Sequence, residues 1–179
     1  MSKVLISVLG EDRPGIIAAV TGILYRLDCN IENVSQTILQ SEFGGLFIAA
    51  IPQNLMPEEL HKHLQSELTP LNLSVHVKPI KSTSVERTIV ESEPFVISIR
   101  GADRKGLVAG ITEVIARYGV NVTNLQAVFK GGDDPDNNIM IYEVDVPIDI
   151  NQQDLYRDLR ERAAVLELDI SIQHRNIFE

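Results

Sequence analysis

One stretch of the chain occurs twice, 91 positions apart. The first copy, residues 10–33, reads GEDRPGIIAAVTGILYRLDCNIEN, and the second, residues 101–124, reads GADRKGLVAGITEVIARYGVNVTN. Nine positions keep the same residue: Gly10/Gly101, Asp12/Asp103, Arg13/Arg104, Gly15/Gly106, Ala18/Ala109, Thr21/Thr112, Arg26/Arg117, Asn30/Asn121 and Asn33/Asn124. A repeat of this length in register predicts two copies of one structural unit, and its period suits a small domain rather than a solenoid.

Each copy has the pattern of a strand, a glycine turn and a helix. Apolar runs at residues 4–9 and 95–99 precede the copies and predict buried strands. Asp12 or Asp103 can cap the following helix, the glycine permits a tight backbone path, and Pro14 suits the first helical turn. Apolar residues at helical spacing then predict one buried face: Ile16, Val20, Ile23, Leu24 and Leu27, and Leu107, Ile111, Val114 and Ile115.

The remainder of each half predicts the same continuation. After the helix, a strand at residues 31–42 leads to a hairpin at Gly44 and Gly45, and residues 46–51 form the returning strand. A helix at residues 56–68 and a strand at 71–80 complete the order βαββαβ. The expected fold class is α+β: two ferredoxin-like units, each with an antiparallel sheet in strand order 4-1-3-2 and helices on one face.

The polar stretch KSTSVERTIVESE separates the two halves. We expect a first domain at residues 1–81, a linker at 82–93 with a short extended piece at 88–90, and a second domain at 94–179. In the second half the paired strands are joined by the longer loop GGDDPDNN at residues 131–138.

Charge and composition exclude several classes of partner. The net charge is −9; residues 1–90 carry 7 basic and 9 acidic side chains, and residues 91–179 carry 9 and 16. An acidic surface without a basic cluster disfavours direct nucleic-acid binding. No apolar run is long enough to span a membrane, and the start MSKVLISV lacks a signal-peptide pattern. The single cysteine, Cys29, fits a reducing, cytoplasmic setting.

The glycine turn is the candidate ligand site. Free backbone N–H groups at a helix start favour an anion such as a carboxylate, and an asparagine can bind both an amino and a carboxylate group. The same residue types serve equally well as a cap, a turn and a strand start, and the arginines can be solvated rather than bound to a ligand. The candidate residues are Asp12, Arg13, Pro14, Gly15, Ile16, Asn30 and Asn33, and in the second copy Asp103, Arg104, Gly106, Leu107, Asn121 and Asn124.

Other chemistry has weaker support. His61 and His63 point to different helix faces, and His76 and His174 are isolated, so a zinc site is not expected. The loop at 131–138 lacks EF-hand spacing and is expected to be a solvated tip, and Cys29 is expected to be a buried or turn thiol. The chain shows neither a P-loop nor a catalytic set, and we expect no cofactor.

The segments DRPGIIAAVT and CNIEN, and DRKGLVAGIT and VNVTN, resemble the ACT family of regulatory domains. The resemblance covers nearly the whole chain as two ACT units, and the tandem arrangement is similar to the glycine cleavage system repressor group of bacteria. Such domains bind amino acids at domain interfaces, through the first turn and the residue that opens the second strand. By resemblance, the ligand-binding residues are Asp12, Gly15 and Asn30, and equally Asp103, Gly106 and Asn121. The chain departs from serine-binding members, which carry Asn and a nearby His where this chain has Asp12 and Gly10.

The resemblance implies a non-catalytic regulator that binds a small amino acid, with glycine as the first candidate. It would act through a protein partner such as a transcription factor, and exposed sheet edges predict a homodimer. The alternative is a regulatory subunit of an amino-acid metabolic enzyme. An enzyme in its own right ranks third: a formyl-folate hydrolase can begin with a similar DRPG segment, but a second ACT unit stands where its catalytic domain would be.

Overall fold

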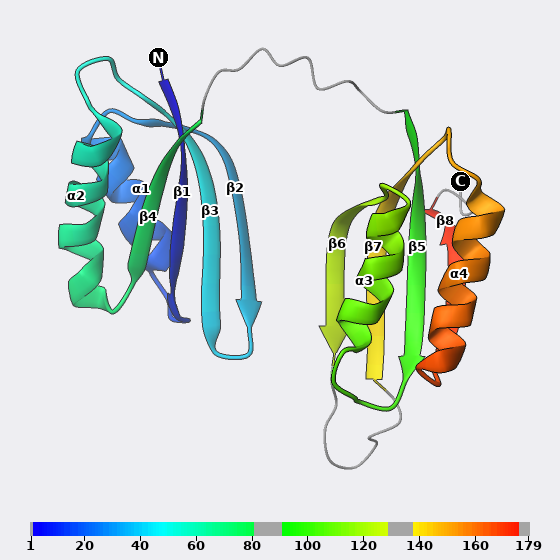
Figure 1. Cartoon of the computed structure of the whole chain (residues 1–179). Helices are drawn as coiled ribbons and strands as arrows, with labels where there is room; N and C mark the ends of the chain where they lie inside the picture. The colour runs from blue at the N-terminus through cyan, green and yellow to red at the C-terminus, as the bar shows by residue number, and fades with distance from the viewer. Residues whose placement is uncertain (1, 81–90, 129–137, 176–179) are drawn as a thin grey trace. The chain divides into compact units, whose positions relative to one another are not determined.

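A computed structural model describes residues 2–80, 91–128 and 138–175, with the side chain of Val128 excepted (Figure 1). The chain divides into two compact units, Met1–Val85 and Glu86–Glu179, called unit 1 and unit 2 below. The expected extended piece at 88–90 and nearly all of the loop at 131–138 lie outside the described residues. The first strand of unit 2 begins at Ser92, so it includes the last two residues of the expected linker.

Both units have the element order βαββαβ. Unit 1 consists of β1 (Ser2–Glu11), α1 (Ile16–Arg26), β2 (Asn30–Leu39), β3 (Glu42–Ile51), α2 (Pro57–Leu68), a 3-10 turn η1 (Thr69–Leu71) and β4 (Ser74–Ile80). Unit 2 consists of β5 (Ser92–Gly101), α3 (Leu107–Arg117), β6 (Asn121–Val128), β7 (Asn138–Pro147), α4 (Gln152–Val165) and β8 (Asp169–His174).

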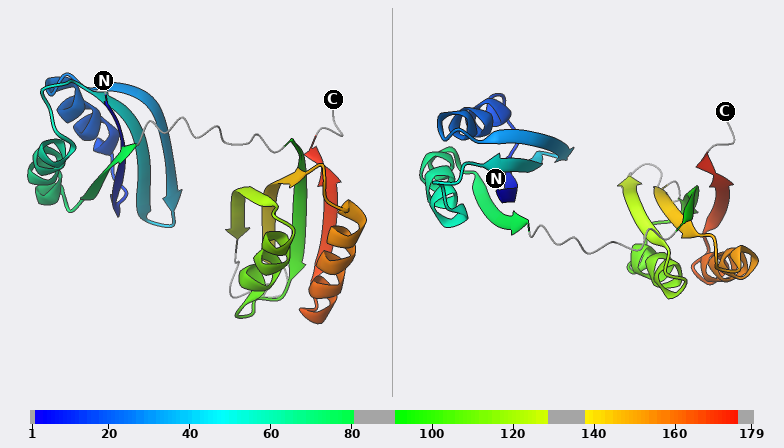
Figure 2. Two further views of the ribbon diagram at one scale, coloured as in Figure 1. Left: turned by 45° about the horizontal axis from the view of Figure 1, so that its top comes forward. Right: turned by 90° about the horizontal axis from the view of Figure 1, so that it is seen from above.

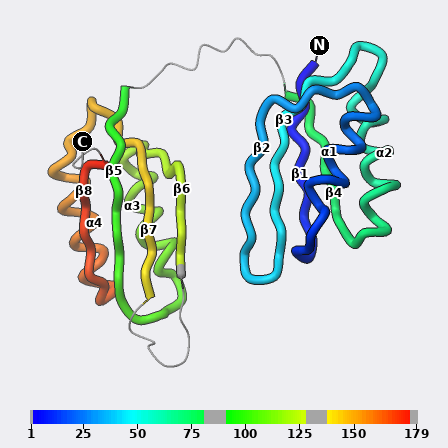
Figure 3. The backbone as a smooth tube through the Cα atoms, turned by 180° about the vertical axis from the view of Figure 1, so that it is seen from behind, coloured from blue at the N-terminus to red at the C-terminus, as the bar shows by residue number. Residues whose placement is uncertain are grey.

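Each unit contains one four-stranded antiparallel sheet. The strand orders are β2-β3-β1-β4 and β6-β7-β5-β8, which confirms the predicted order 4-1-3-2 (Figure 3). Both helices of a unit lie on the same face of its sheet (Figure 2). The first and third strands are therefore central, and the turn that follows the first strand lies at the end of a central strand.

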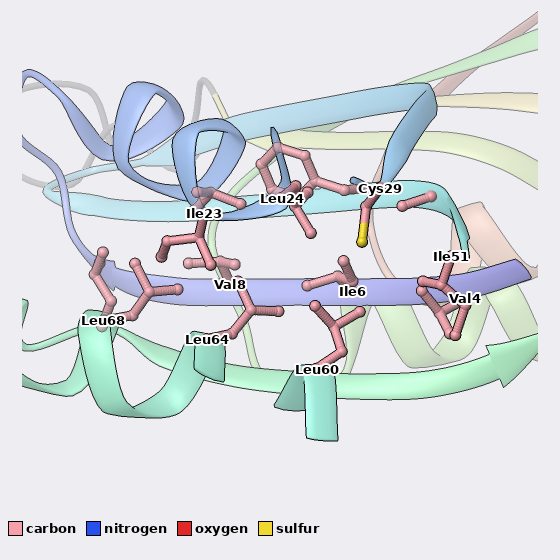
Figure 4. Packing of buried hydrophobic residues seen from close by; sticks show 14 of the residues in the cluster. Val4, Ile6, Val8, Ile23, Leu24, Cys29, Ile51, Leu60, Leu64 and Leu68 are labelled. Atoms are coloured by element: carbon pink, nitrogen blue, oxygen red, sulfur yellow. The ribbon is translucent and has the colours of Figure 1, made fainter. Parts of the chain in front are cut away.

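The core of each unit lies between its sheet and its helices. In unit 1, alternate residues of β1 point toward Ile23 and Leu24 of α1 and toward leucines of α2 (Figure 4). Val4, Ile6 and Val8 are fully buried there. The predicted helix faces are confirmed, with Leu27 partly buried at the edge of the core.

The predicted hairpin at Gly44 and Gly45 is wrong. The chain turns at Gln40 and Ser41, with Gln40 at φ 57, and both glycines lie inside β3. A Cβ atom on Gly45 would lie 2.8 Å from the Phe43 ring and 3.1 Å from the Phe47 ring. The glycine is needed because two aromatic rings pack across its position, not because the backbone reverses there.

In the described residues, no helix is long and apolar enough to cross a membrane.

Candidate functional site

The turn from β1 to α1 leaves the start of the helix uncapped by a side chain. Gly15 is the N-cap residue with φ 96, in the left-handed region that favours glycine, and α1 begins at Ile16. The prediction that Asp12 caps the helix is wrong, because the left-handed glycine redirects the chain three residues after it. The prediction that Pro14 lies in the first helical turn is also wrong, because Pro14 precedes the N-cap residue. The first intrahelical bond runs from Ala19 N to Gly15 O at 2.9 Å.

An uncapped helix start presents several backbone donors to its surroundings. The first amides of α1 have no acceptor within the helix, and the helix dipole places partial positive charge there. The turn itself is fixed, because Asp12 N donates to Ser41 O at 2.7 Å and so joins it to the β2–β3 hairpin. The donors are thus held in place beside the sheet, which suits a preformed anion site.

A pocket of ≈ 470 Å³ opens at these donors. Its charged lining residues are Asp12 and Arg13, and its polar contribution from the sheet is Gln36 of β2. The remaining lining is small or apolar: Gly15, Ile16, Ile17, Ala18 and Phe43. The pocket therefore combines a guanidinium, a carboxylate and a side-chain amide with an otherwise small or apolar lining.

Arg13 lies between this pocket and a smaller neighbour of ≈ 230 Å³ that Pro14 and Leu71 also line. Its guanidinium donates a hydrogen bond to the backbone carbonyl of Leu71 in η1. Within the part of the chain that the structure describes, Arg13 forms no ion pair, and the group that it contacts through a hydrogen bond is a neutral carbonyl. Its positive charge remains available to a ligand.

A larger hollow of ≈ 580 Å³ lies on the other side of Gly10, between the end of α2 and β4. Among the described residues that line it, Glu42 is the only charged one. A carboxylate would find repulsion there rather than a partner, so the smaller pocket at the turn is the better candidate for an amino acid.

Gly10 has a structural role. A Cβ atom at Gly10 would lie 2.7 Å from Leu73 Cδ2 and 2.8 Å from Asn72 O, and one at Gly101 would lie 2.6 Å from Leu168 Cδ2. The close approach of the chain before β4 or β8 therefore requires glycine in both units. Thr21 is also structural, since its Oγ1 donates to Ile17 O at 2.9 Å.

The turn of unit 2 has the same backbone but different partners. Gly106 is the N-cap residue of α3 with φ 87, and again no side chain caps the helix, so Asp103 is not the predicted cap either. Arg104 forms an ion pair with Glu167, which lies between α4 and β8. By sheet register, Ala127 and Asn138 occupy the positions that Gln36 and Phe43 occupy in unit 1.

The asparagines at the strand starts do not lie at the turn of their own unit. Asn30 pairs with Ala50, and Ala50 pairs with Lys3 at the beginning of β1, whereas the turn follows the other end of that strand. Asn121 and Asn124 are placed likewise on β6, where Asn124 Nδ2 donates to Glu143 Oε1 at 2.9 Å. The turn residues are thus brought together, and the asparagines could join them only from another molecule or unit.

Two pocket residues, Gln36 and Phe43, were missed by sequence reasoning. The signal was present for Gln36, because Val34, Gln36 and Ile38 alternate with Ser35 and Thr37 along β2. That alternation places one polar side chain on the helix side of an edge strand. Phe43 gave no such signal, because a phenylalanine near the start of a strand is ordinarily predicted to be a core residue.

The remaining candidates of the sequence have local structural explanations. His61 Nε2 lies 3.2 Å from Val75 O, and its ring meets His76 edge-on at 6.2 Å. In the described residues, no three His, Cys, Asp or Glu side chains gather as metal ligands would. Cys29 is buried; burial, and then the charge of Asp28, raise the pKa of its thiol. A raised pKa lowers the fraction of reactive thiolate.

Comparison with known proteins agrees with this architecture. The sequence model of the ACT domain matches residues 2–78 and again residues 93–173. A UPF0237 protein from Methanopyrus kandleri is 30% identical over 79 residues, which is 44% of this chain and 88% of the relative. A UPF0237 protein from Pyrobaculum aerophilum is 33% identical over 78 residues, which is 43% of this chain and 87% of the relative.

Two solved structures share the fold over nearly the whole chain. A crystal structure of a protein from Galdieria sulphuraria has a TM-score of 0.76 at 19% identity and covers 97% of this chain and 98% of its own. A protein assigned provisionally as a glycine cleavage system transcriptional repressor has a TM-score of 0.65 at 18% identity, with 96% of each chain covered. Since the family model matches most of the sequence and both units have its fold, the chain belongs to the ACT domain family, with two ACT units in tandem.

Proposed function

We propose that this protein is a non-catalytic regulator that binds a small amino acid at the β1–α1 turn of unit 1. The observation that carries the proposal is the pocket at the uncapped start of α1, which Asp12 and Arg13 line together. A free amino acid is a zwitterion, so its binding site needs donors for the carboxylate and an acceptor for the ammonium group a few ångströms apart. This pocket offers both on a fixed backbone turn.

The roles of the lining residues follow from their charges. The amides at the start of α1 and the Arg13 guanidinium would bind the carboxylate. Asp12 and the Gln36 side-chain oxygen would accept hydrogen bonds from the ammonium group. Ile16 and Phe43 would contact the ligand side chain, and the modest pocket favours a small one, with glycine as the first candidate.

We expect the protein to act as a homodimer formed along β2. This edge strand is uncharged from Asn33 to Leu39, and Val34 and Ile38 are 44% and 50% exposed. Edge strands are ordinarily protected by charges, prolines or bulges, and in β2 the charged Glu32, which pairs with Lys3, and the bulge between Ile31 and Asn33 are both confined to the start of the strand. A neighbouring copy would cover this edge and would bring further residues, Asn30 and Asn33 among the candidates, toward the pocket.

Signal output would go through a protein partner, with a transcription regulator as the first candidate. The fold similarity to the provisionally assigned repressor of glycine cleavage supports that choice. The acidic chain would not bind DNA itself. Affinity purification would separate this partner from the alternative, an enzyme of amino-acid metabolism.

Calorimetry of the full chain against the twenty amino acids tests the binding claim. Gln36→Ala should weaken the tightest interaction about 3- to 10-fold, as expected for the loss of one hydrogen bond of about 1 kcal/mol. Ser35→Ala is the matched control, because the neighbouring side chain points to the other face of the sheet. Absence of binding by every amino acid, or equal losses in both variants, would reject the proposal.

A further inference from the structure

The arginine of the repeated Asp-Arg pair has a different partner in each unit. Arg13 donates to the backbone carbonyl of Leu71, whereas Arg104 is paired with the carboxylate of Glu167. A carboxylate is what a bound amino acid would bring to this guanidinium. In unit 2 a side chain of the chain itself thus stands where the ligand's carboxylate is proposed to bind in unit 1.

Glu167 and Asn72 occupy the same position of the two units. Asn72 follows η1 with φ 52, and Glu167 follows α4 with φ 52. The carbonyl oxygens of both approach the glycine that precedes the turn, at 2.8 Å from a Cβ built on Gly10 and 3.3 Å from one built on Gly101. The left-handed conformation suits asparagine better than glutamate, so Glu167 is not explained by its backbone.

We propose that the residue at this position decides which turn accepts an amino acid: Glu167 acts as an internal carboxylate that occupies Arg104, and Asn72 leaves Arg13 open. The inference rests on the proposed function, which places the ligand in unit 1, and adds the residue that keeps the turn of unit 2 from binding it. Arg104 and Glu167 are 44% and 72% exposed, so their pairing is a surface ion pair of modest strength. Competition from such a pair reduces carboxylate binding about 2- to 5-fold.

Other differences between the turns act in the same direction. Unit 2 has Ala127 where unit 1 presents Gln36, and Asn138 where unit 1 presents Phe43. Lys105, which replaces Pro14, is the exception, because its ammonium adds a positive charge that would attract a carboxylate. The internal carboxylate is the feature among these that a single substitution can reverse.

Reciprocal substitutions in the full chain test the inference. Glu167→Asn releases Arg104, and Asn72→Glu places a carboxylate beside Arg13; Glu167→Gln is the control that keeps the shape and removes the charge. Phenylglyoxal reacts more slowly with a guanidinium group that is paired with a carboxylate, and peptide mass mapping reports each arginine separately. Arg104 should react about 2- to 5-fold faster in Glu167→Asn and Glu167→Gln, and Arg13 slower by a similar factor in Asn72→Glu.

A second arm uses calorimetry with glycine. Asn72→Glu should weaken glycine binding about 2- to 5-fold, and Glu167→Asn should leave the affinity of the main site unchanged. Unchanged arginine reactivity in all three variants would overturn the inference. Altered reactivity without any glycine binding in the parent chain would uphold the role of Glu167 and reject the proposed glycine site, so the two failures are distinguishable.

Discussion

Unit 1 and unit 2 share a backbone design but differ in what surrounds it. Both have the left-handed glycine before the first helix, the crowded glycine at the end of the first strand, and the bulge in the edge strand. The differences lie in side chains: Gln36 against Ala127, Phe43 against Asn138, and the partner of the motif arginine. The shared glycines therefore maintain the turn, and under our proposal the residues that differ decide which of the two turns binds a ligand.

The largest effect is expected in the core, where a substitution can destabilise one unit and leave the other intact. Phe47 and Tyr142 occupy equivalent positions in β3 and β7, and both are fully buried. Phe47→Ala should destabilise unit 1 by about 3–5 kcal/mol and leave unit 2 unaffected, because each unit has its own core. Urea unfolding should separate into two transitions; a single transition shifted as a whole would show that the units fold together.

The next effect depends on pH and concerns unit 2. Burial raises the pKa of Tyr142 to about 12, and its hydroxyl donates a weak hydrogen bond to Met140 Sδ at 3.7 Å. The folded unit therefore keeps the phenol proton to higher pH than the unfolded chain. The contribution of Tyr142 to the free energy of unfolding should be fully present below pH 10. It should be lost as the pH rises, which lowers the free energy of unfolding by about 2–3 kcal/mol between pH 10 and 12.

Thermal unfolding of the full chain from pH 9 to pH 12 measures this loss. Tyr142→Phe should remove this part of the alkaline destabilisation, since unit 1 already carries Phe47 at the equivalent position. The variant should be nearly as stable as the parent at pH 7, because a buried hydroxyl with a weak partner contributes little. An unchanged alkaline profile in Tyr142→Phe would contradict the assignment.

The smallest effect concerns the turn after the first helix. Asp28 has φ 55, whereas its counterpart Gly119 has φ 66, and glycine is the residue that tolerates this region best. Asp28→Gly should stabilise unit 1 and Gly119→Asp should destabilise unit 2, each by about 1 kcal/mol. Chemical unfolding measures both; changes of the same sign would show that the two turns are not equivalent.

The fold was predictable because the internal repeat showed that the chain contains two copies of one structural unit. Two copies of the same spacing predicted two βαββαβ units, and right-handed crossovers within each unit predicted the sheet order that the structure confirms. The hairpin was misplaced because glycine has two uses: Gly45 is required by the rings of Phe43 and Phe47, and the actual turn uses Gln40. Local sequence does not distinguish a glycine needed for space from one needed for a turn.

The site was predictable only in part. Asp12, Arg13, Gly15 and Ile16 are contiguous, so the turn brought them together. Gln36 comes from an edge strand that approaches the turn only in the folded sheet, and Glu167 reaches Arg104 across 63 residues of sequence. The asparagines were grouped with the turn because they recur with it and because the ACT resemblance marks the residue that opens the second strand; in the structure the helix carries the chain to the opposite end of the sheet.

The central claim is that an amino acid binds at the first turn of unit 1, and a site-resolved NMR titration tests it most directly. The full chain labelled with nitrogen-15 would be titrated with the amino acid that calorimetry ranks first. We predict that the amide signals of residues 15–18 and the side-chain amide of Gln36 shift together and saturate, while those of residues 106–109 respond only at several-fold higher concentration. Shifts confined to unit 2, or signals at residues 15–18 that never move, would contradict it.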